Sequence, residues 1–239
     1  MKASENLGPK YKCEVCRDLT FIMKDDVYYE CECRAVREAE NILKRSGISI
    51  EFSKKTFDNF NFTYDYQISE AYRCACLYVN EFLDFEKTRA NSIMFLGQVG
   101  SGKTHLSLAI ANELMAKGIG VLYMPYRDAI TTLKQNILDG EYYTREVEKY
   151  KRARVLLIDD LYKGNITKSD INIMFEIINH RYFNNKPVII SSEMNFNELL
   201  KIDESIESRL FEMSEGRVIS LKGKELNYRH NKSKIEEID

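Results

Sequence analysis

Short apolar stretches alternate with helical patterns along most of the chain. Five stretches of strand length are nearly continuous runs of apolar or β-branched residues, at positions 92–96, 121–125, 155–159, 187–191 and 217–221. Helical patterns run from Ile68 to about Phe85 and near 127–150. Continuous apolar strands are buried on both faces, and strands that alternate with helices form parallel sheets. The pattern therefore predicts an α/β fold with a five-stranded parallel sheet covered by helices.

The start of the chain does not follow this alternation. Residues 1–50 are polar and contain four of the six cysteines, which predicts a small separate module there and a larger α/β domain over residues 55–239. Only residues 222–239 follow the last predicted strand, so we expect no C-terminal lid domain.

Composition and charge narrow the class of protein. With 239 residues, 44% hydrophobic and 30% charged, the chain is typical of a globular protein. The net charge of −2 excludes a strong overall attraction to nucleic acid, so any DNA contact must be local. No apolar run approaches the roughly 20 residues of a membrane span, and the N-terminus lacks the apolar core of a signal peptide. We expect a cytoplasmic protein with no membrane partner.

The stretch GQVGSGKT at 97–104 lies between a predicted strand and a predicted helix. It matches GxxxxGK[ST], in which backbone N–H groups surround phosphate oxygens. Lys103 would reach the β- and γ-phosphates and Thr104 would ligate Mg²⁺. The alternative, a glycine-rich turn with a surface lysine, leaves the flanking strand and helix unexplained. The predicted ATP-binding residues are Gly97, Gly100, Ser101, Gly102, Lys103 and Thr104.

Hydrolysis requires a second carboxylate site on a neighbouring strand, and VLLIDD at 155–160 supplies one. Asp159 would hold Mg²⁺, and Asp160 would orient or deprotonate the attacking water. Both aspartates could instead simply begin a loop. The run PVIISSE at 187–193 suits a strand inserted between the two motifs, which would present Ser192 or Glu193 to the γ-phosphate. Ser192 could equally cap the helix that begins near Asn195.

Cysteine spacing points to a metal site in the N-terminal module. Two close pairs, CEVC and CEC, are separated by fourteen residues, which suits tetrahedral Zn²⁺ binding by thiolates. Free thiols, or redox use of CEVC, are the alternatives. The predicted zinc ligands are Cys13, Cys16, Cys31 and Cys33. Cys74 and Cys76 lie on an apolar helical pattern, and we expect them to be buried core residues.

Five segments together carry a resemblance to a known family. They are KTFDNF (55–60), GQVGSGKTHLSLAIANEL (97–114), LLIDDL (156–161), INHRYFNNKPVIISS (178–192) and ESRLFEM (207–213). With them the chain resembles AAA+ ATPases of the DnaC/DnaI helicase-loader type, phage versions included, with the IstB-like transposition ATPases as close relatives. The resemblance implies an AAA+ P-loop core with sheet order 5-1-4-3-2. It also implies that Arg209 is an arginine finger for the adjacent subunit's nucleotide and Arg229 a second sensor. The family commonly has asparagine at the sensor position where this chain has Glu193.

The same resemblance implies cofactors and partners. Loaders of the DnaI type carry a comparable N-terminal zinc module that binds the replicative helicase. The implied cofactors are ATP, Mg²⁺ and Zn²⁺. The implied partners are a DnaB-type helicase hexamer and single-stranded DNA, with a homo-oligomer of this chain formed on the helicase.

Other functions and smaller features remain open at this point. An IstB-type transposition regulator shares the core, although the zinc module argues against it, and a small-molecule P-loop kinase has no evident use for the cysteines. The basic stretch KYKRARV at 149–155 is either a single-strand DNA contact or a charged helix end. Phe57, Phe60 and Phe62 either wall an adenine pocket or pack the core.

Overall fold

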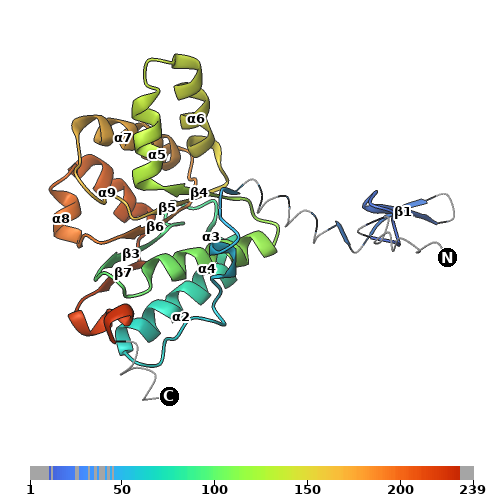
Figure 1. Ribbon diagram of the computed structural model, residues 1–239, viewed down its shortest axis with the longest axis horizontal. Helices are drawn as coiled ribbons and strands as arrows, with labels where there is room; N and C mark the ends of the chain where they lie inside the picture. The colour runs from blue at the N-terminus through green and yellow to red at the C-terminus, as the bar shows by residue number, and fades with distance from the viewer. Residues whose placement is uncertain are drawn as a thin grey trace, which may run out of the picture.

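The computed structural model describes residues 11, 13–24, 27–31, 33–34, 37, 41, 44 and 46–231. Its α/β core is built around one parallel sheet (Figure 1). Within the described residues, no helix has both the length and the apolar character needed to cross a membrane.

Five strands form the sheet: β3 (Ile93–Gly97), β4 (Val121–Pro125), β5 (Val155–Asp159), β6 (Val188–Ser192) and β7 (Val218–Leu221). They lie in the order β4-β5-β6-β3-β7. Numbered within the sheet, this is the order 5-1-4-3-2 read from the opposite edge, so the predicted fold class and strand order are confirmed. β6 pairs with both β3 and β5, as expected for a strand inserted between the two nucleotide motifs.

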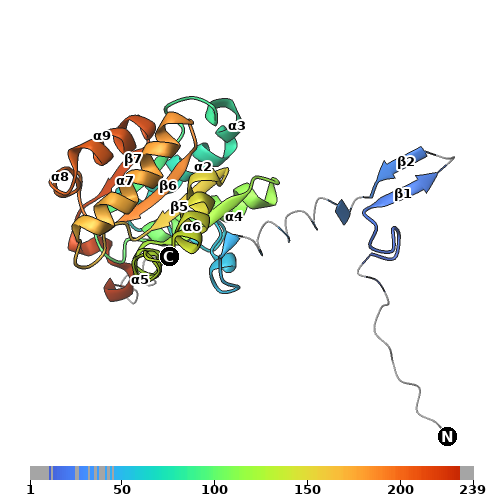
Figure 2. The ribbon, with the colours of Figure 1, turned by 90° about the horizontal axis from the view of Figure 1, so that it is seen from above.

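Helices cover both faces of the sheet (Figure 2). One face carries α2 (Tyr66–Asn80), α3 (Phe82–Phe85) and α4 (Lys103–Ala116), and the short 3-10 helix η1 (Phe52–Lys54) packs on the same side. The other face carries α5 (Tyr126–Gln135), α6 (Gly140–Arg152), α7 (Lys168–Phe183), α8 (Phe196–Leu200) and α9 (Glu204–Met213). A second 3-10 helix, η2 (Lys224–Leu226), follows β7.

Alternate strand residues serve the two faces. Phe95 and Ile189 join the hydrophobic cluster beneath α2 and α4, whereas Met94 and Ile190 join the cluster beneath α7 and α9. Because side chains along a strand alternate between faces, this division also decides which residues at the strand ends can reach the phosphate-binding loop.

The helix predicted over 68–85 is broken in the structure. It begins after the N-cap Asp65 and ends at Asn80. A short separate turn, α3, then brings Phe82 and Phe85 onto the ring of Tyr78, at centroid distances of 5.6 and 5.2 Å. Aromatic packing therefore redirects the chain where the sequence pattern alone predicts one continuous helix.

The N-terminal module contains an antiparallel hairpin of β1 (Phe21–Lys24) and β2 (Val27–Glu30). Ile48, which the sequence places within the 1–50 module, instead packs in the same core cluster as Phe60 and Ile68. The α/β core therefore includes the chain from about residue 46.

One buried charged residue, Arg181, connects α7 to the end of α6 and the start of β6. Arg181 of α7 is fully buried, and no carboxylate pairs with it in the described part of the chain. Its guanidinium donates hydrogen bonds to the carbonyls of Tyr150 (2.8 Å), Ala153 (2.9 Å) and Pro187 (2.6 Å). These carbonyls belong to the last turn of α6, the residue after it and the residue before β6, so Arg181 holds these chain segments together.

Candidate nucleotide-binding and zinc sites

The phosphate-binding loop joins the end of β3 to the start of α4, and two of its glycines have no room for a side chain. A Cβ on Gly97, at φ +103°, would lie 2.3 Å from the carbonyl oxygen of Leu221. A Cβ on Gly102, at φ +88°, would lie 2.5 Å from the ring of Phe60. The loop therefore needs glycine at these positions both for its backbone conformation and for its close packing.

Lys103, the first residue of α4, is 5% exposed. Its Nζ donates hydrogen bonds to the carbonyls of Gly97 (2.8 Å) and Gln98 (2.6 Å). Burial lowers the pKa of Lys103 to about 8, while the nearby carboxylates of Glu193 and Asp160 act to raise it. Phosphate oxygens would offer this ammonium stronger, charge-assisted bonds than the two neutral carbonyls.

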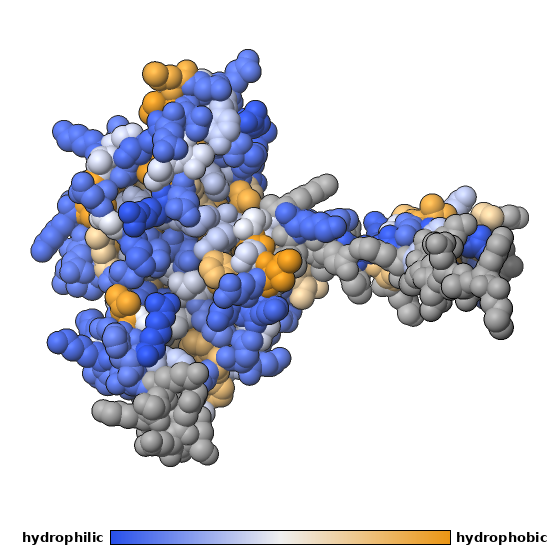
Figure 3. All heavy atoms as spheres, in the orientation of Figure 1, coloured by the Kyte–Doolittle hydropathy of each residue, from blue (hydrophilic) through white to orange (hydrophobic). Residues whose placement is uncertain are grey.

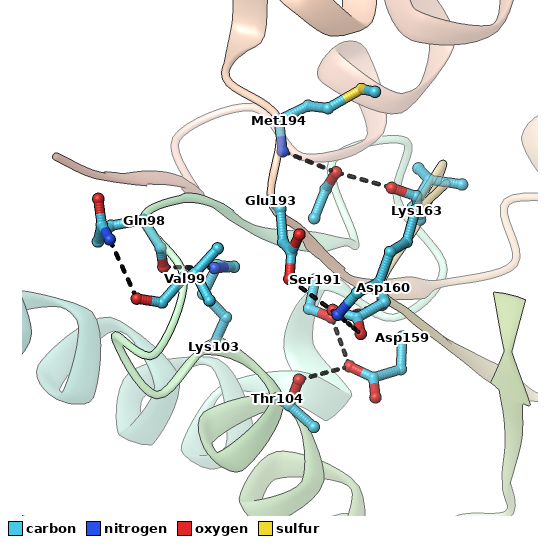
Figure 4. A network of polar contacts seen from close by, with 12 residues as sticks. Gln98, Val99, Lys103, Thr104, Asp159, Asp160, Lys163, Ser191, Glu193 and Met194 are labelled. Atoms are coloured by element: carbon cyan, nitrogen blue, oxygen red, sulfur yellow. Dashed lines mark hydrogen bonds and ion pairs between the residues drawn. The ribbon is translucent and has the colours of Figure 1, made fainter. Parts of the chain in front are cut away.

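Asp159, the last residue of β5, is surrounded by hydroxyl groups (Figure 4). Its Oδ1 accepts hydrogen bonds from Thr104 Oγ1 (2.8 Å) and from the Ser191 hydroxyl, and its Oδ2 accepts one from the Tyr123 hydroxyl (3.1 Å). Adjacent ligands of an octahedral Mg²⁺ ion lie about 3 Å apart. The spacing of Thr104 and Asp159 therefore fits the predicted magnesium pair.

Tyr123 and Ser191 are not among the residues predicted for this site. Strand alternation gives the signal for Ser191, because it follows Ile189 by two residues and so lies on the α4 face of the sheet. Tyr123 gives a weaker signal, because β4 is an edge strand and the reach of its side chain to Asp159 depends on the strand order.

Ser192 lies on the opposite face of β6 from the phosphate-binding loop. Its hydroxyl donates to the carbonyl of Leu161 (2.8 Å) and accepts from the N–H of Met194 (3.3 Å). The following helix is capped by Asn195 instead. Ser192 therefore neither faces the phosphate-binding loop nor caps the following helix. Glu193, by contrast, lines the nucleotide cavity.

Asp160 begins the turn that follows β5, with its backbone at φ +56°. Its N–H donates to the Ser191 hydroxyl (2.9 Å), and its carboxylate accepts from Lys163 Nζ (2.8 Å). The same Nζ lies 2.8 Å from a carboxylate oxygen of Glu193. Lys163 therefore links the predicted water-orienting residue to the residue at the sensor position, an arrangement that the sequence motifs did not indicate.

These groups open onto one cavity of about 640 Å³. Apart from the phosphate loop and the carboxylates, its walls come from the segment 51–64, from His105 and Leu108 of α4, from Lys163 and from the chain after β7. Phe60 contributes to both the cavity wall and the core, whereas Phe57 and Phe62 pack on Tyr72 with centroid distances of 5.7 and 4.1 Å. The cavity is large enough for a nucleotide, and its wall contains both polar and aromatic groups.

The segment after β7 reaches the phosphate-binding loop. The N–H of Tyr228 donates to the carbonyl of Gly100 (3.1 Å), and Arg229 is exposed at the edge of the cavity that it lines. The structure thus brings the predicted second sensor, Arg229, to the same cavity as Lys103 and Asp160.

Arg209 lies on α9, which covers the opposite face of the sheet from α4. Its guanidinium lies against the rings of Phe175 (5.6 Å) and Tyr182 (5.4 Å), and its Nη1 donates to the carbonyl of Ser205. Residues of α9 do not line the cavity of their own subunit within the described chain. Arg209 therefore lies apart from the nucleotide cavity of its own chain.

The basic stretch at 149–155 is largely paired with acidic side chains. Lys151 and Arg152 contact Glu148 at 2.7 and 2.5 Å, and Arg154 contacts Glu86 at 2.6 Å. These pairs balance much of its charge, which favours a charged helix end over a DNA-binding patch.

The four predicted zinc ligands converge in the N-terminal module. The sulfurs of Cys13 and Cys31 lie 3.8 Å apart, those of Cys16 and Cys33 lie 3.3 Å apart, and all four are within 4.8 Å of one another. Tetrahedral Zn²⁺ with bonds of about 2.3 Å would separate sulfurs by roughly 3.8 Å. The cluster therefore fits a structural zinc ion.

The other two cysteines differ from expectation. Cys74 and Cys76 lie on α2 and are partly exposed rather than buried. The core face of α2 is made by Ile68, Ala71, Ala75, Tyr78 and Val79. The two thiols flank that face instead of belonging to it.

Known proteins with similar sequences or folds include a phage-like element protein, an insertion-sequence ATP-binding protein and a helicase loader. The Bacillus subtilis (strain 168) phage-like element PBSX protein XkdC is 34% identical over 241 residues, covering 95% of this chain and 90% of that protein. The ATP-binding protein of insertion sequence IS5376 from Geobacillus stearothermophilus is 27% identical over 165 residues, covering 69% of this chain and 62% of that protein. The crystal structure of the DnaC helicase loader has a similar fold, with a TM-score of 0.65 and 23% identity over 73% of this chain and 100% of that one.

The family model described as IstB-like ATP binding protein matches residues 20–232, which include all five strands of the parallel sheet and the phosphate-binding loop. ATPase activity is expected throughout this family. The chain therefore belongs to the IstB-like family of AAA+ P-loop ATPases, to which the DnaC-type proteins are related.

Proposed function

We propose that this protein is an ATP-dependent loader that places a replicative helicase of the DnaB type on single-stranded DNA. The observation that carries the proposal is the combination of an AAA+ nucleotide site with a four-cysteine module at the N-terminus. The similarity of fold to the DnaC helicase loader supports it.

Within the nucleotide site, each group has a separate task. Lys103 exchanges its two backbone carbonyls for phosphate oxygens. Thr104 and Asp159 hold Mg²⁺, which supplies positive charge to the phosphates. Asp160 orients the attacking water, and Arg229 contacts the nucleotide from the cavity edge.

Arg209 acts between subunits in this proposal. Its guanidinium lies on α9, away from the cavity of its own chain, and partly exposed beside Phe175 and Tyr182. When chains assemble on the helicase, Arg209 would reach the γ-phosphate bound by the next chain. Hydrolysis is then coupled to assembly, because a single chain lacks this cation.

The zinc module is proposed as the helicase-binding element. The thiolates of the four cysteines would hold Zn²⁺, which supplies folding energy to a module with little core. Its hairpin and cysteine loops expose Val15, Leu19, Met23 and Tyr28, each at least 63% exposed. Figure 3 shows apolar atoms at the surface of this module. Such a surface suits a protein partner better than DNA.

The test uses the full-length protein and the host replicative helicase. Isothermal titration should show that Cys13→Ser with Cys16→Ser abolishes helicase binding and leaves ATP binding intact. The matched control, Cys74→Ser with Cys76→Ser, changes two thiols outside the cluster and should retain both activities. Unchanged helicase binding by the Cys13/Cys16 variant, with its zinc content shown to be lost, would contradict the proposal.

A transposition ATPase is the second candidate, favoured by the similarity to the IS5376 ATP-binding protein. It predicts ATP-dependent binding and bending of duplex DNA rather than helicase binding. A gel-shift and bending assay with duplex DNA, run beside the helicase titration, separates the two functions.

A further inference from the structure

Lys163 brings a second lysine into the nucleotide cavity. Its Nζ lies 2.8 Å from a carboxylate oxygen of Asp160 and 2.8 Å from one of Glu193. Figure 4 shows its side chain extending to these two carboxylates, beside Asp159. An ammonium group has three N–H donors, so these two contacts leave a third donor for another acceptor in the cavity.

Left-handed backbone on either side of Lys163 accompanies a side chain that reaches Asp160 and Glu193 while staying 43% exposed to solvent. Asp160 and Tyr162 have left-handed φ values of +56° and +60°, and Gly164 follows at +102°. This conformation is unfavourable for non-glycine residues and persists only where packing enforces it. The fully buried ring of Tyr162, at 5.5 Å from that of Tyr126, provides this packing.

The positive charge of Lys163 offsets the negative charges of the carboxylates around the cavity. Glu193 lines the cavity and would face the γ-phosphate in the proposed site, where its negative charge would repel that of the phosphate. The charges of Glu193, Asp160 and Lys163 all act on the pKa of Lys103, so these groups surround one common space. The paired carboxylates raise the pKa of Lys163 itself, which keeps it charged.

We propose that Lys163 is a γ-phosphate-binding catalytic residue supplied by the same subunit. On ATP binding its ammonium keeps its contact with Asp160 and donates to a γ-phosphate oxygen. The inference rests on the proposed nucleotide site but does not depend on the helicase-loading role. It also explains how a site with glutamate at position 193 accepts a triphosphate.

The chemistry of hydrolysis uses this contact directly. The water oxygen forms a bond to the γ-phosphorus while the bond from that phosphorus to the bridging oxygen breaks. The bonding electron pair leaves with ADP, and a proton of the water passes to Asp160. Lys163 would stabilise charge on the γ-phosphoryl oxygens throughout, so its effect on ATP has no counterpart for ADP.

The experiment measures ATP and ADP affinities of the full-length chain, together with single-turnover hydrolysis. Lys163→Met should weaken ATP binding by roughly tenfold or more, as expected for one charge-assisted hydrogen bond, and should slow turnover. ADP affinity should change less than about twofold. The matched control is Lys168→Met, an exposed lysine at the start of α7, which should alter neither affinity.

A double variant separates phosphate contact from simple neutralisation of Glu193. If Lys163 binds phosphate, Lys163→Met with Glu193→Gln keeps a reduced preference for ATP over ADP. Full recovery of that preference in the double variant would overturn the proposal, as would equal loss of both affinities in Lys163→Met. Failure of the unaltered chain to bind either nucleotide would overturn this inference and the nucleotide site together, whereas failure to bind helicase alone would leave Lys163 assigned.

Discussion

Replacing Arg181 by methionine tests the part of the core that holds β5 and β6 in place. Methionine keeps much of the side-chain length but removes every donor. The carbonyls of Tyr150, Ala153 and Pro187 would then be buried without their partner. Buried carbonyls without a donor destabilise the folded state, because in the unfolded chain the same carbonyls accept hydrogen bonds from water.

The magnitude follows from these contacts. Three bonds of 2.6–2.9 Å from a charged donor contribute about 1.5–3 kcal/mol each. Relief of the guanidinium's desolvation returns several kcal/mol, so the net loss of unfolding free energy should be about 3 kcal/mol. With a denaturant slope near 3 kcal/mol per molar urea, the midpoint should fall by roughly 1 M.

Urea denaturation followed by circular dichroism measures this shift. The matched control is Arg145→Met, which removes an exposed guanidinium paired with Glu146 at 3.3 Å and should cost under about 1 kcal/mol. If Arg181→Met shifts the midpoint no more than Arg145→Met does, the carbonyl contacts do not stabilise the core as argued.

Three further predictions concern the site and its neighbours. Lys103→Ala should lose ATP binding, whereas Asp160→Asn should bind ATP and hydrolyse it at least tenfold more slowly; equal loss of affinity in titrations would refute this division. Arg209→Ala should keep the ATP affinity of the single chain but lower turnover of the assembly, and mixing it with Lys103→Ala chains should restore some activity, an outcome measured by phosphate release at several ratios. Burial, with Asp203 next in effect, raises the pKa of Glu207 to about 8 from its usual value near 4.5. The folded state then keeps a proton that the unfolded state has lost, so stability should fall as pH rises from about 4.5 to 8, by up to about 1.4 kcal/mol per pH unit, and Glu207→Gln should remove this slope in urea titrations.

The sequence predicted those parts of the site that depend on strand ends. Asp159 ends β5, and Thr104 lies just beyond the loop that follows β3; because β3 and β5 run in the same direction, the two side chains lie at the same edge of the sheet. Ser191 was within reach of the same argument, because counting two residues from Ile189 places it on the α4 face and leaves Ser192 on the other.

Other parts depend on geometry that residue patterns do not contain. The contact of Lys163 with Asp160 and Glu193 requires left-handed backbone at Asp160 and Tyr162, neither of which is glycine. The burial of Arg181 likewise depends on three carbonyls from separate segments, whereas an arginine in a helix ordinarily predicts a surface residue. Tertiary packing decides both.

The hydrogen bond from the Tyr228 N–H to the Gly100 carbonyl gives the phosphate loop an optical reporter. The chain contains no tryptophan, so Tyr228→Trp would introduce a single tryptophan beside the loop, whose emission can be excited apart from that of the tyrosines, without replacing any residue of the loop. The neighbouring ring of Tyr64, at 5.9 Å, provides an aromatic surface against which that indole would lie. Tryptophan emission from this position would report the binding and release of nucleotide in real time. The same samples could be used to follow assembly of the protein with its partners.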